Sequence, residues 1–315
     1  MSNRYCRSWC SDRKPDATGV LVPADPAVTH LEFPEGRIAY RLLGDTGPPV
    51  VLLHGGGLDN STLTWGRLAR ELAVGHRVHS PDLPKHGGSW PWRALADQRA
   101  LEDLVPRLLD HWGLRSATLI GLSLGATTAI GAALRHPQRV DRLVLTSSGG
   151  IQDRVPGAGR HELAWLALRT PLSRLITRSQ TAATLARHVR GFPFADDVPA
   201  QERERLVAGI VAEHRAKRDG HMFSDWNRVE IGFRRMRTDH RPELHRIACP
   251  TLVLHGAADA VVPVRYAREA ASLIPGARLV VVEGASHSAP MDHPTQVGAA
   301  VREFLDQTRD AAPGA

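Results

Sequence analysis

Short runs rich in apolar residues recur along this chain of 315 residues, and within them apolar and polar residues do not alternate. A strand that is covered on both faces has this composition, and such strands are typical of parallel sheets. The first run is VVLLH at residues 50–54. Similar runs follow at residues 77–79, 117–121, 142–146, 251–255 and 278–282. The chain is therefore predicted to build a mostly parallel sheet.

Helical patterns separate these runs. They lie at residues 65–73, 95–112, 124–135, 264–274 and 294–307. Before the first run, residues 31–33 and 37–42 flank a Pro-Glu-Gly turn and predict a hairpin. Strands that alternate with helices imply right-handed crossovers and helices on both faces of the sheet. The predicted fold class is therefore α/β, with a mostly parallel, doubly wound sheet.

The alternation breaks once, between residues 149 and 246, where the pattern is helical and no comparable apolar run occurs. We expect this segment to be a helical cap inserted into a core made of residues 28–148 and 247–310. Residues 1–27 mix Arg, Asp, Pro and Ser without periodicity. They are expected to form a flexible N-terminal extension.

Composition and charge narrow the class of protein. With 42% hydrophobic and 23% charged residues, the chain is not collagen-like, coiled-coil, disulfide-framed or wholly disordered. Its formal net charge is +7, and the excess lies in residues 151–246, which hold 18 Lys and Arg against 12 Asp and Glu. Such a segment could attract nucleic acid, a membrane surface or an acidic substrate. Because the charges are scattered among acids without interleaved aromatics, solvated helix faces are the default interpretation and a mild preference for an anionic small molecule is the second. No nucleic-acid partner is expected.

No membrane partner is expected either. The uncharged stretch at residues 116–134 is long enough to cross a bilayer, but its Gly, Ser and Thr content favours a buried strand, a turn and a buried helix. The N-terminus lacks the apolar core of a secretory signal, so we expect a cytoplasmic protein. Three cysteines fit a reducing compartment, and no ligand pair lies near Cys6 and Cys10. We expect no metal ion and no cofactor. The oligomeric state is left open.

The apolar run at residues 117–121 leads into the sequence GLSLG at residues 121–125, and a helical pattern follows directly. A serine on a strained turn between a strand and a helix has this signature, with glycines two residues to either side so that no Cβ atoms collide. The helix N-terminus also favours developing negative charge. The alternative is a glycine-rich packing turn. The placement favours Ser123 as a nucleophile.

A serine hydroxyl needs a base, and the base needs a partner that orients it. Asp259 follows the run at residues 251–255, and His287 follows the run at residues 278–282. Reactive groups in such sheets collect beyond the carboxyl ends of the strands. The order Ser123, Asp259, His287 is the one expected for a triad on this kind of fold.

The sequence HGGG at residues 54–57 follows the first apolar run. Glycines let backbone amides approach an oxyanion closely, because no Cβ atom intervenes. The amides of Gly56, Gly57 and Leu124 are the predicted donors. A flexible surface turn is the alternative.

Five motifs stand in order along the chain: HGGG, PDLPKHG at residues 81–87, GLSLG, HGAAD at residues 255–259, and GASH at residues 284–287 with Pro294 beyond it. In these the chain resembles the α/β-hydrolase superfamily, in the branch with a helical cap after the sixth strand. The resemblance covers about residues 29–306. It implies a cofactor-independent serine hydrolase that acts on a small molecule.

Several residues differ from the motifs of other branches of the superfamily, and these differences exclude some reaction classes. Ser123 stands where dehalogenases and epoxide hydrolases of this superfamily carry an aspartate. Gly57 and Leu124 depart from the proline iminopeptidase pattern, and Leu122 and Ser288 from that of the carbon–carbon bond hydrolases. What remains is a carboxylesterase, lactonase or thioesterase. The alternative is a protein of this fold that does not hydrolyse: a lyase, a cyclase, a cofactor-free oxygenase or a ligand receptor.

For several other polar and aromatic side chains we expect a structural role or a place in the pocket lining. His54 and His86 are expected to brace their loops, and Asp82 to support loop structure. His293, at a predicted helix start, is expected to cap the helix or contact solvent. Trp90 and Trp92 are candidates for the pocket entrance. Six side chains of the helical segment either line an apolar pocket or pack within the cap: Trp165, Phe192, Phe194, Met222, Phe223 and Trp226.

Overall fold

The computed structural model of the chain describes residues 14–15, 21–22, 26–217 and 222–309. Most of the expected N-terminal extension, including Cys6 and Cys10, lies outside the described residues. The described part of that extension holds two short strands, β1 (Lys14–Pro15) and β2 (Leu21–Val22), which pair antiparallel.

One mixed sheet carries the fold, with the strand order β10-β9-β8-β7-β5-β6-β4-β3. Its pairs are parallel from β10 to β6, whereas β4 pairs antiparallel with both β6 and β3. The mostly parallel sheet and the opening hairpin predicted from the sequence are confirmed. The strands are β3 (Thr29–Phe33), β4 (Gly36–Leu43), β5 (Pro49–Leu53), β6 (Arg77–Pro81), β7 (Ala117–Leu122), β8 (Val140–Thr146), β9 (Thr251–Gly256) and β10 (Arg278–Val282).

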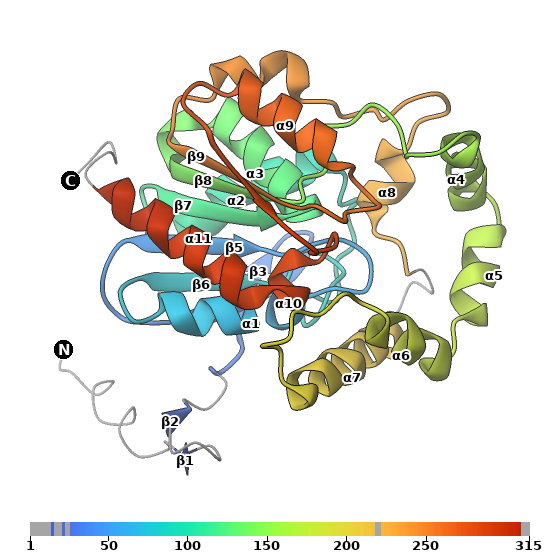
Figure 1. The fold of residues 1–315 in the computed structure, drawn as a ribbon, viewed down its shortest axis with the longest axis horizontal. Coiled ribbons are helices and arrows are strands. Elements are labelled where there is room, and N and C mark those ends of the chain that lie inside the picture. The colour runs from blue at the N-terminus through green and yellow to red at the C-terminus, as the bar shows by residue number, and fades with distance from the viewer. Residues whose placement is uncertain (1–13, 16–20, 23–25, 218–221, 310–315) are drawn as a thin grey trace.

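Helices cover both faces of the sheet (Figure 1). The apolar residues of α1 (Ser61–Leu72) and α11 (Pro294–Gln307) pack on one face, where Trp65 is completely buried. Those of α2 (Gln98–His111), α3 (Leu124–Arg135) and α9 (Val264–Leu273) pack on the other. The sheet is therefore doubly wound, as predicted. The stretch at residues 116–134 forms β7 and α3 rather than a membrane span.

Two helices begin at other residues than the sequence predicted, and in each a polar N-cap residue precedes the helix. The first helix begins at Ser61 instead of residue 65, because the Asn60 side chain accepts hydrogen bonds from the amides of Thr62 and Leu63. Asp97 accepts from the Ala100 amide in the same way, so α2 begins at Gln98. The predicted start is thus too late for α1 and three residues too early for α2, and the N-cap residues define both starts.

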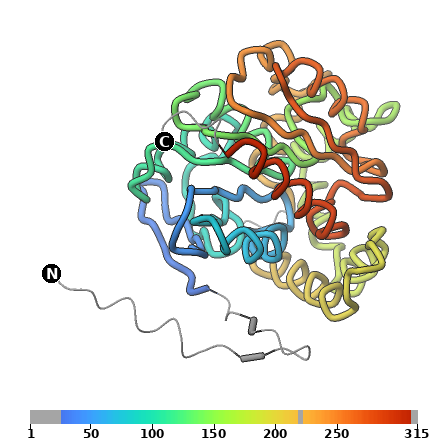
Figure 2. The backbone as a smooth tube through the Cα atoms, turned by 60° about the vertical axis from the view of Figure 1, so that its left-hand side comes forward, coloured from blue at the N-terminus to red at the C-terminus, as the bar shows by residue number. Residues whose placement is uncertain are grey.

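The helical insertion, residues 149–246, lies between β8 and β9. One segment of the insertion passes close to α10 (Ala289–Asp292), where the Ala195 amide donates to the Asp292 carbonyl at 2.8 Å. Figures 1 and 2 show the insertion beside the sheet and its helices. None of the described helices has the length and apolar content needed to cross a bilayer. The described helices of the insertion are α4 (Arg160–Arg169), α5 (Leu172–Ser179), α6 (Ala182–Arg190), α7 (Ala200–Ala216) and α8 (Asp225–Glu230).

Candidate active site

Ser123 occupies the turn between β7 and α3 with a strained backbone, at φ 51° and ψ −106°. A positive φ is costly for a residue with a side chain, so its surroundings must hold it there. The Ser123 amide donates to the Thr146 carbonyl at 3.0 Å, and the Ser123 carbonyl accepts from the amides of Thr127 and Gly149. These bonds tie the turn to the end of β8 and to the first turn of α3.

The two glycines of GLSLG are needed for close packing, as the sequence predicted. A Cβ atom on Gly121 would lie 2.4 Å from the amide nitrogen of Ala126. A Cβ atom on Gly125 would lie 2.1 Å from the Leu53 carbonyl oxygen. Real Cβ atoms essentially never approach backbone this closely, so only glycine allows α3 to pass so near β5 and the serine turn.

His287 and Asp259 meet at the carboxyl ends of β10 and β9. The Nδ1 atom of His287 lies 2.8 Å from Oδ2 of Asp259. Asp259 is buried, whereas the His287 side chain is 21% exposed. Because Nδ1 faces the carboxylate, Nε2 is the ring nitrogen that remains for the other side of the ring.

Asp259 has a second histidine beside it. The Nε2 atom of buried His255 lies 3.2 Å from Oδ2 of Asp259 and 2.7 Å from the Val262 carbonyl oxygen. Burial by itself would raise the pKa of Asp259. The hydrogen bonds from His255 and His287, the charge of His287 and the Val262 amide outweigh burial and hold this pKa well below its usual range. The carboxylate is thus ionised at neutral pH.

Backbone contacts fasten the acid loop to the histidine loop. The amides of Ala257 and Ala258 donate to the carbonyls of Val282 and Ala285, each at 2.9 Å. A Cβ atom on Gly256 would lie 2.3 Å from the Ser286 carbonyl oxygen, so the glycine of HGAAD permits this approach. The two loops therefore hold Asp259 and His287 in one rigid arrangement.

Asp292 and its neighbour His293 form hydrogen bonds next to the loop that carries His287. Asp292 accepts hydrogen bonds from the amide and hydroxyl of Ser286, and its other oxygen lies 2.9 Å from Nδ1 of His293. The expectation for His293 was wrong: its side chain is buried and makes no capping bond at the start of α11. The adjacent buried carboxylate is a better partner for this ring than solvent.

Asp59, which the sequence did not predict as a site residue, holds the HGGG loop at residues 54–57 in place. Asp59 accepts hydrogen bonds from the Gly55 amide at 2.8 Å and from the Thr64 hydroxyl. Burial raises the pKa of Asp59 despite these bonds and the nearby His54. Because Gly55 donates to Asp59, its amide is already occupied. No described hydrogen bond is donated by the amides of Gly56 or Leu124.

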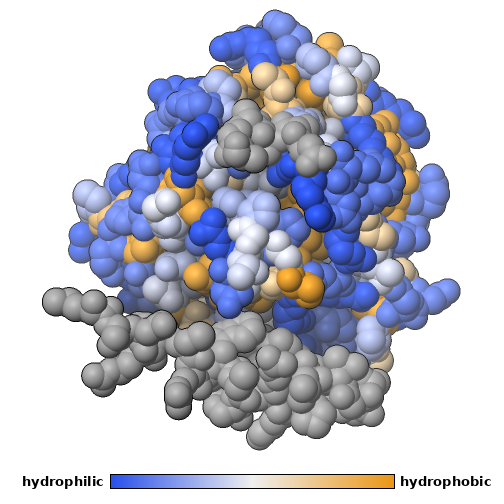
Figure 3. Space-filling view, turned by 90° about the vertical axis from the view of Figure 1, so that its left-hand side faces the viewer, coloured by the Kyte–Doolittle hydropathy of each residue, from blue (hydrophilic) through white to orange (hydrophobic). Residues whose placement is uncertain are grey.

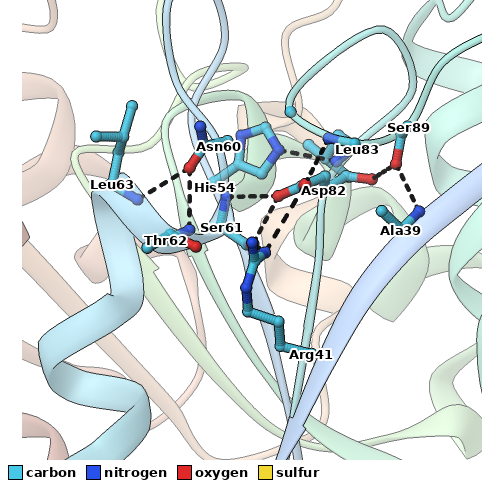
Figure 4. A network of polar contacts seen from close by, with 12 residues as sticks. Ala39, Arg41, His54, Asn60, Ser61, Thr62, Leu63, Asp82, Leu83 and Ser89 are labelled. Carbon is cyan, nitrogen blue, oxygen red and sulfur yellow. Dashed lines mark hydrogen bonds and ion pairs between the residues drawn. The ribbon is translucent and has the colours of Figure 1, made fainter. Parts of the chain in front are cut away.

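Polar contacts behind this loop match the expected structural roles (Figure 4). The Leu83 amide donates to Nε2 of His54 at 2.8 Å. The amide and hydroxyl of Ser61 both donate to Asp82, at 2.9 and 2.6 Å. In Figure 4 these groups join the loops after β5 and β6. His86 accordingly has its Nδ1 atom 2.9 Å from the Pro84 carbonyl oxygen within its own loop.

A cavity of about 430 Å³ brings the predicted residues together. Ser123 and His287 both line it, as do Gly56, Gly57 and Leu124, while Asp259 lies behind the imidazole. Among the described residues no hydrogen bond joins Ser123 to His287. A second cavity of about 410 Å³ opens between α1 and α7, but none of the predicted site residues lines it.

The rest of the lining is largely apolar and comes mostly from the helical insertion. Of the aromatic and methionine candidates, four line the cavity: Phe192, Met222, Phe223 and Trp226. The other two, Trp165 and Phe194, pack elsewhere in the insertion. The proposal for Trp90 and Trp92 was wrong, because both are buried away from the cavity and Trp92 packs with Phe33 and Ile38. In the described lining there is no lysine or arginine.

Within the described residues, no cluster of His, Cys, Asp and Glu side chains is placed to hold a metal ion. A partly exposed serine, an imidazole and a buried carboxylate lie at a largely apolar cavity. The family model described as the alpha/beta hydrolase fold matches residues 48–294. The chain belongs to the alpha/beta hydrolase family.

Relatives in this family include esterases. A pimeloyl-[acyl-carrier protein] methyl ester esterase of Edwardsiella ictaluri is 31% identical over 82% of this chain and 93% of its own length. A hydrolase from Pseudomonas aeruginosa is similar in structure, with a TM-score of 0.69, 27% identity, and coverage of 88% of this chain and 98% of that one. A thermophilic esterase from Thermogutta terrifontis has a TM-score of 0.68 and 26% identity, covering 89% of this chain and 98% of that one.

Proposed function

We propose that this member of the family is a serine hydrolase that cleaves a carboxylic ester, lactone or thioester through an acyl-enzyme intermediate. The observation that carries the proposal is the position of His287. Its Nδ1 atom is hydrogen-bonded to buried Asp259, and its ring lines the same cavity as Ser123. An oriented imidazole beside a serine on a strained turn is the arrangement that serine nucleophiles use.

In the acylation step, Ser123 Oγ bonds to the carbonyl carbon while its proton passes to Nε2 of His287. The bond from this carbon to the alcohol or thiol then breaks, and the leaving group takes that proton. In deacylation, His287 takes a proton from a water molecule whose oxygen bonds to the acyl carbon. The bond from this carbon to Ser123 Oγ then breaks, Oγ takes the proton from His287, and the acid is released. Asp259 orients the imidazole and stabilises its protonated form.

The tetrahedral intermediate carries an oxyanion, which we assign to the amides of Gly56 and Leu124, with Gly57 as a further donor. Two features support this assignment. These residues line the cavity beside Ser123, and Leu124 is the first residue of α3, where unpaired amides and the helix dipole favour negative charge.

We further infer that the helical insertion, residues 149–246, acts as a cap and selects the substrate. It contributes much of the apolar lining, including Leu185, Val189, Phe192 and Ile210. An apolar acyl or alcohol group therefore fits this cavity better than a highly charged one. The esterase names of several relatives support the reaction class.

The test is a panel of p-nitrophenyl esters with short, medium and long acyl chains, together with lactones and thioesters. The wild-type protein should hydrolyse at least one of them, with the best rates for apolar acyl groups. Ser123→Ala should reduce that rate by about 10³-fold or more, because triad residues act as a unit. Ser272→Ala, on α9 and outside the cavity lining, is the matched control and should keep the wild-type rate. An undiminished rate in Ser123→Ala would refute the proposal.

A further inference from the structure

The outer side of the helical insertion exposes large apolar side chains. Leu163 and Leu166 lie three residues apart on α4, and Leu172 and Leu175 lie three residues apart on α5. Phe233 joins them, since its ring packs against Trp165 of α4 with 4.9 Å between the ring centroids. We call Leu163, Leu166, Leu172, Leu175 and Phe233 the apolar patch. Their exposed fractions are 59%, 48%, 39%, 63% and 54%.

Helix α5 buries polar residues and exposes apolar ones, the reverse of an ordinary surface helix. Its buried positions are Ser173 and Thr177, one turn apart, whereas Leu172 and Leu175 face outward. The inward hydroxyls are hydrogen-bonded, because Thr177 donates to the Ser173 carbonyl and accepts from the Met222 amide. A surface helix normally buries its apolar stripe and exposes its polar one. The exposed leucines of α5 thus form an apolar face without a covering element among the described residues.

The charge around the apolar patch is positive. Between Glu162 and the end of α5 at Ser179 the sequence contains no Asp or Glu, but it contains three arginines: Arg169, Arg174 and Arg178. The Arg169 guanidinium lies 5.2 Å from the centroid of the Trp165 ring, beside the patch. Arg234, next to Phe233 in the chain, lies over that ring at 5.9 Å. Apolar side chains and arginines therefore share one surface.

Helices α4 and α5 stand next to each other at the side of the molecule away from β1 and β2 (Figure 1). The opposite side looks different. There, apolar residues occur in small groups among hydrophilic ones (Figure 3). The apolar patch is formed by side chains of α4, α5 and the segment after α8.

We propose that the apolar patch docks on an anionic phospholipid surface. Leucine and phenylalanine side chains enter the region between head groups and acyl chains, and arginines contact lipid phosphates while their stems cover apolar area. This peripheral mode needs no membrane-spanning helix, and it departs from the expectation, drawn from the sequence, that the protein has no membrane partner. It also brings the cavity-lining helix α6 close to the bilayer, because α6 follows α5 directly in the chain.

Charge favours lipid over a second copy of this chain. In a twofold contact through the same patch, the arginines of one copy would face those of the other. Like charges in close contact oppose association, whereas phosphates attract them. A dimer through the patch is therefore the outcome that would speak against the proposal.

The test is co-sedimentation of the full-length protein with vesicles. The probes are vesicles of phosphatidylcholine alone and of phosphatidylcholine with about 30% phosphatidylglycerol, the anionic lipid that should attract the arginines. The bound fraction should be higher on anionic vesicles and should fall at about 0.5 M salt, where screening shortens the reach of the charges. The double variant L166E/L175E should bind about tenfold less.

The matched control is the double variant V74E/L95E, which makes the same charge change at two exposed apolar positions outside the insertion. It should bind vesicles as the wild type does, and so should Ser123→Ala, so the result does not depend on the proposed hydrolase activity. L166E/L175E should remain folded by circular dichroism, because both leucines are exposed. No sedimentation with anionic vesicles, or equal losses in both double variants, would overturn the proposal. So would a dimer in ultracentrifugation that L166E/L175E dissociates and that binds no vesicles.

Discussion

Ser123 shows how a few neighbours determine what one side chain can do. Its positive φ is held by three backbone hydrogen bonds, and glycine on either side allows the turn to fit between β5 and α3. Strain of this kind persists only where the surroundings enforce it. The residue most important for the proposed chemistry therefore depends on Gly121 and Gly125, which carry no functional group.

Gly125→Ala should destabilise the protein by about 3 kcal/mol or more, because the new Cβ atom would collide with the carbonyls of Leu53 and His54. The control is Gly75→Ala, where a Cβ atom meets nothing within 4 Å. There the free energy of unfolding should change by no more than about 1 kcal/mol, towards greater stability. Urea unfolding of both variants measures this. Equal stability of the two would contradict the packing argument.

Residues of the site differ in how well the sequence predicts them. Ser123, Asp259 and His287 each follow an apolar strand, so their positions could be expected at one edge of the sheet. Asp59 and His255 could not be expected as supports. They act by bonds to a neighbouring loop amide and to a carboxylate, and side-chain direction inside a loop leaves no periodic signal.

The bounds of helices and strands agree with the sequence prediction where apolar residues lie at or near both ends of the element. The bounds of α3, α11 and β10 agree with the apolar patterns, whereas α1 and α2 begin where Asn60 and Asp97 act as N-caps. How the helical insertion joins the core was not predicted. It uses buried polar contacts: Lys85 Nζ lies 2.6 Å from Asp225 at the start of α8. Such pairs join residues 140 positions apart in the chain, which periodicity cannot reveal.

Asp225→Asn should lower the free energy of unfolding by about 3 kcal/mol, because it leaves the largely buried Lys85 ammonium without its carboxylate. The Ala96 amide, which donates to the same oxygen at 3.1 Å, loses a charged acceptor as well. Glu204→Gln removes the exposed ion pair with Arg190 and is the control, with stability close to that of the wild type. Thermal and urea unfolding compare the two. A stable Asp225→Asn protein would show that this pair does not hold α8 to the core.

The whole molecule is expected to be sensitive to mild acid, because several histidines are buried in neutral form. Burial lowers the pKa of His79 to about 4, and it holds the pKa values of His86 and His240 below their ordinary value. In the unfolded chain these groups titrate near the ordinary value of about 6.5. As the pH falls below that value, the unfolded state binds protons that the folded state does not, so stability decreases.

Wild-type protein should therefore lose stability between pH 7.5 and pH 5, and His79 alone should contribute about 2 kcal/mol of that loss. The ring of His79 packs at a tilt against Trp112 with 4.4 Å between ring centroids, and its Nδ1 atom has no hydrogen-bond partner in the described structure. His79→Phe keeps an aromatic ring without a titrating group, so its stability should fall less over this range. Urea unfolding at both pH values measures the difference. An identical pH dependence in the variant would contradict the account.

The central claim is that Ser123 is a nucleophile activated by His287, and a fluorophosphonate probe tests it directly. Intact-mass and peptide mass spectrometry should find one phosphonyl adduct, on Ser123, and His287→Ala should react at least about 100-fold more slowly because the base is gone. An unlabelled wild-type protein, an adduct on another serine, or a His287→Ala protein that reacts at the wild-type rate would contradict the claim.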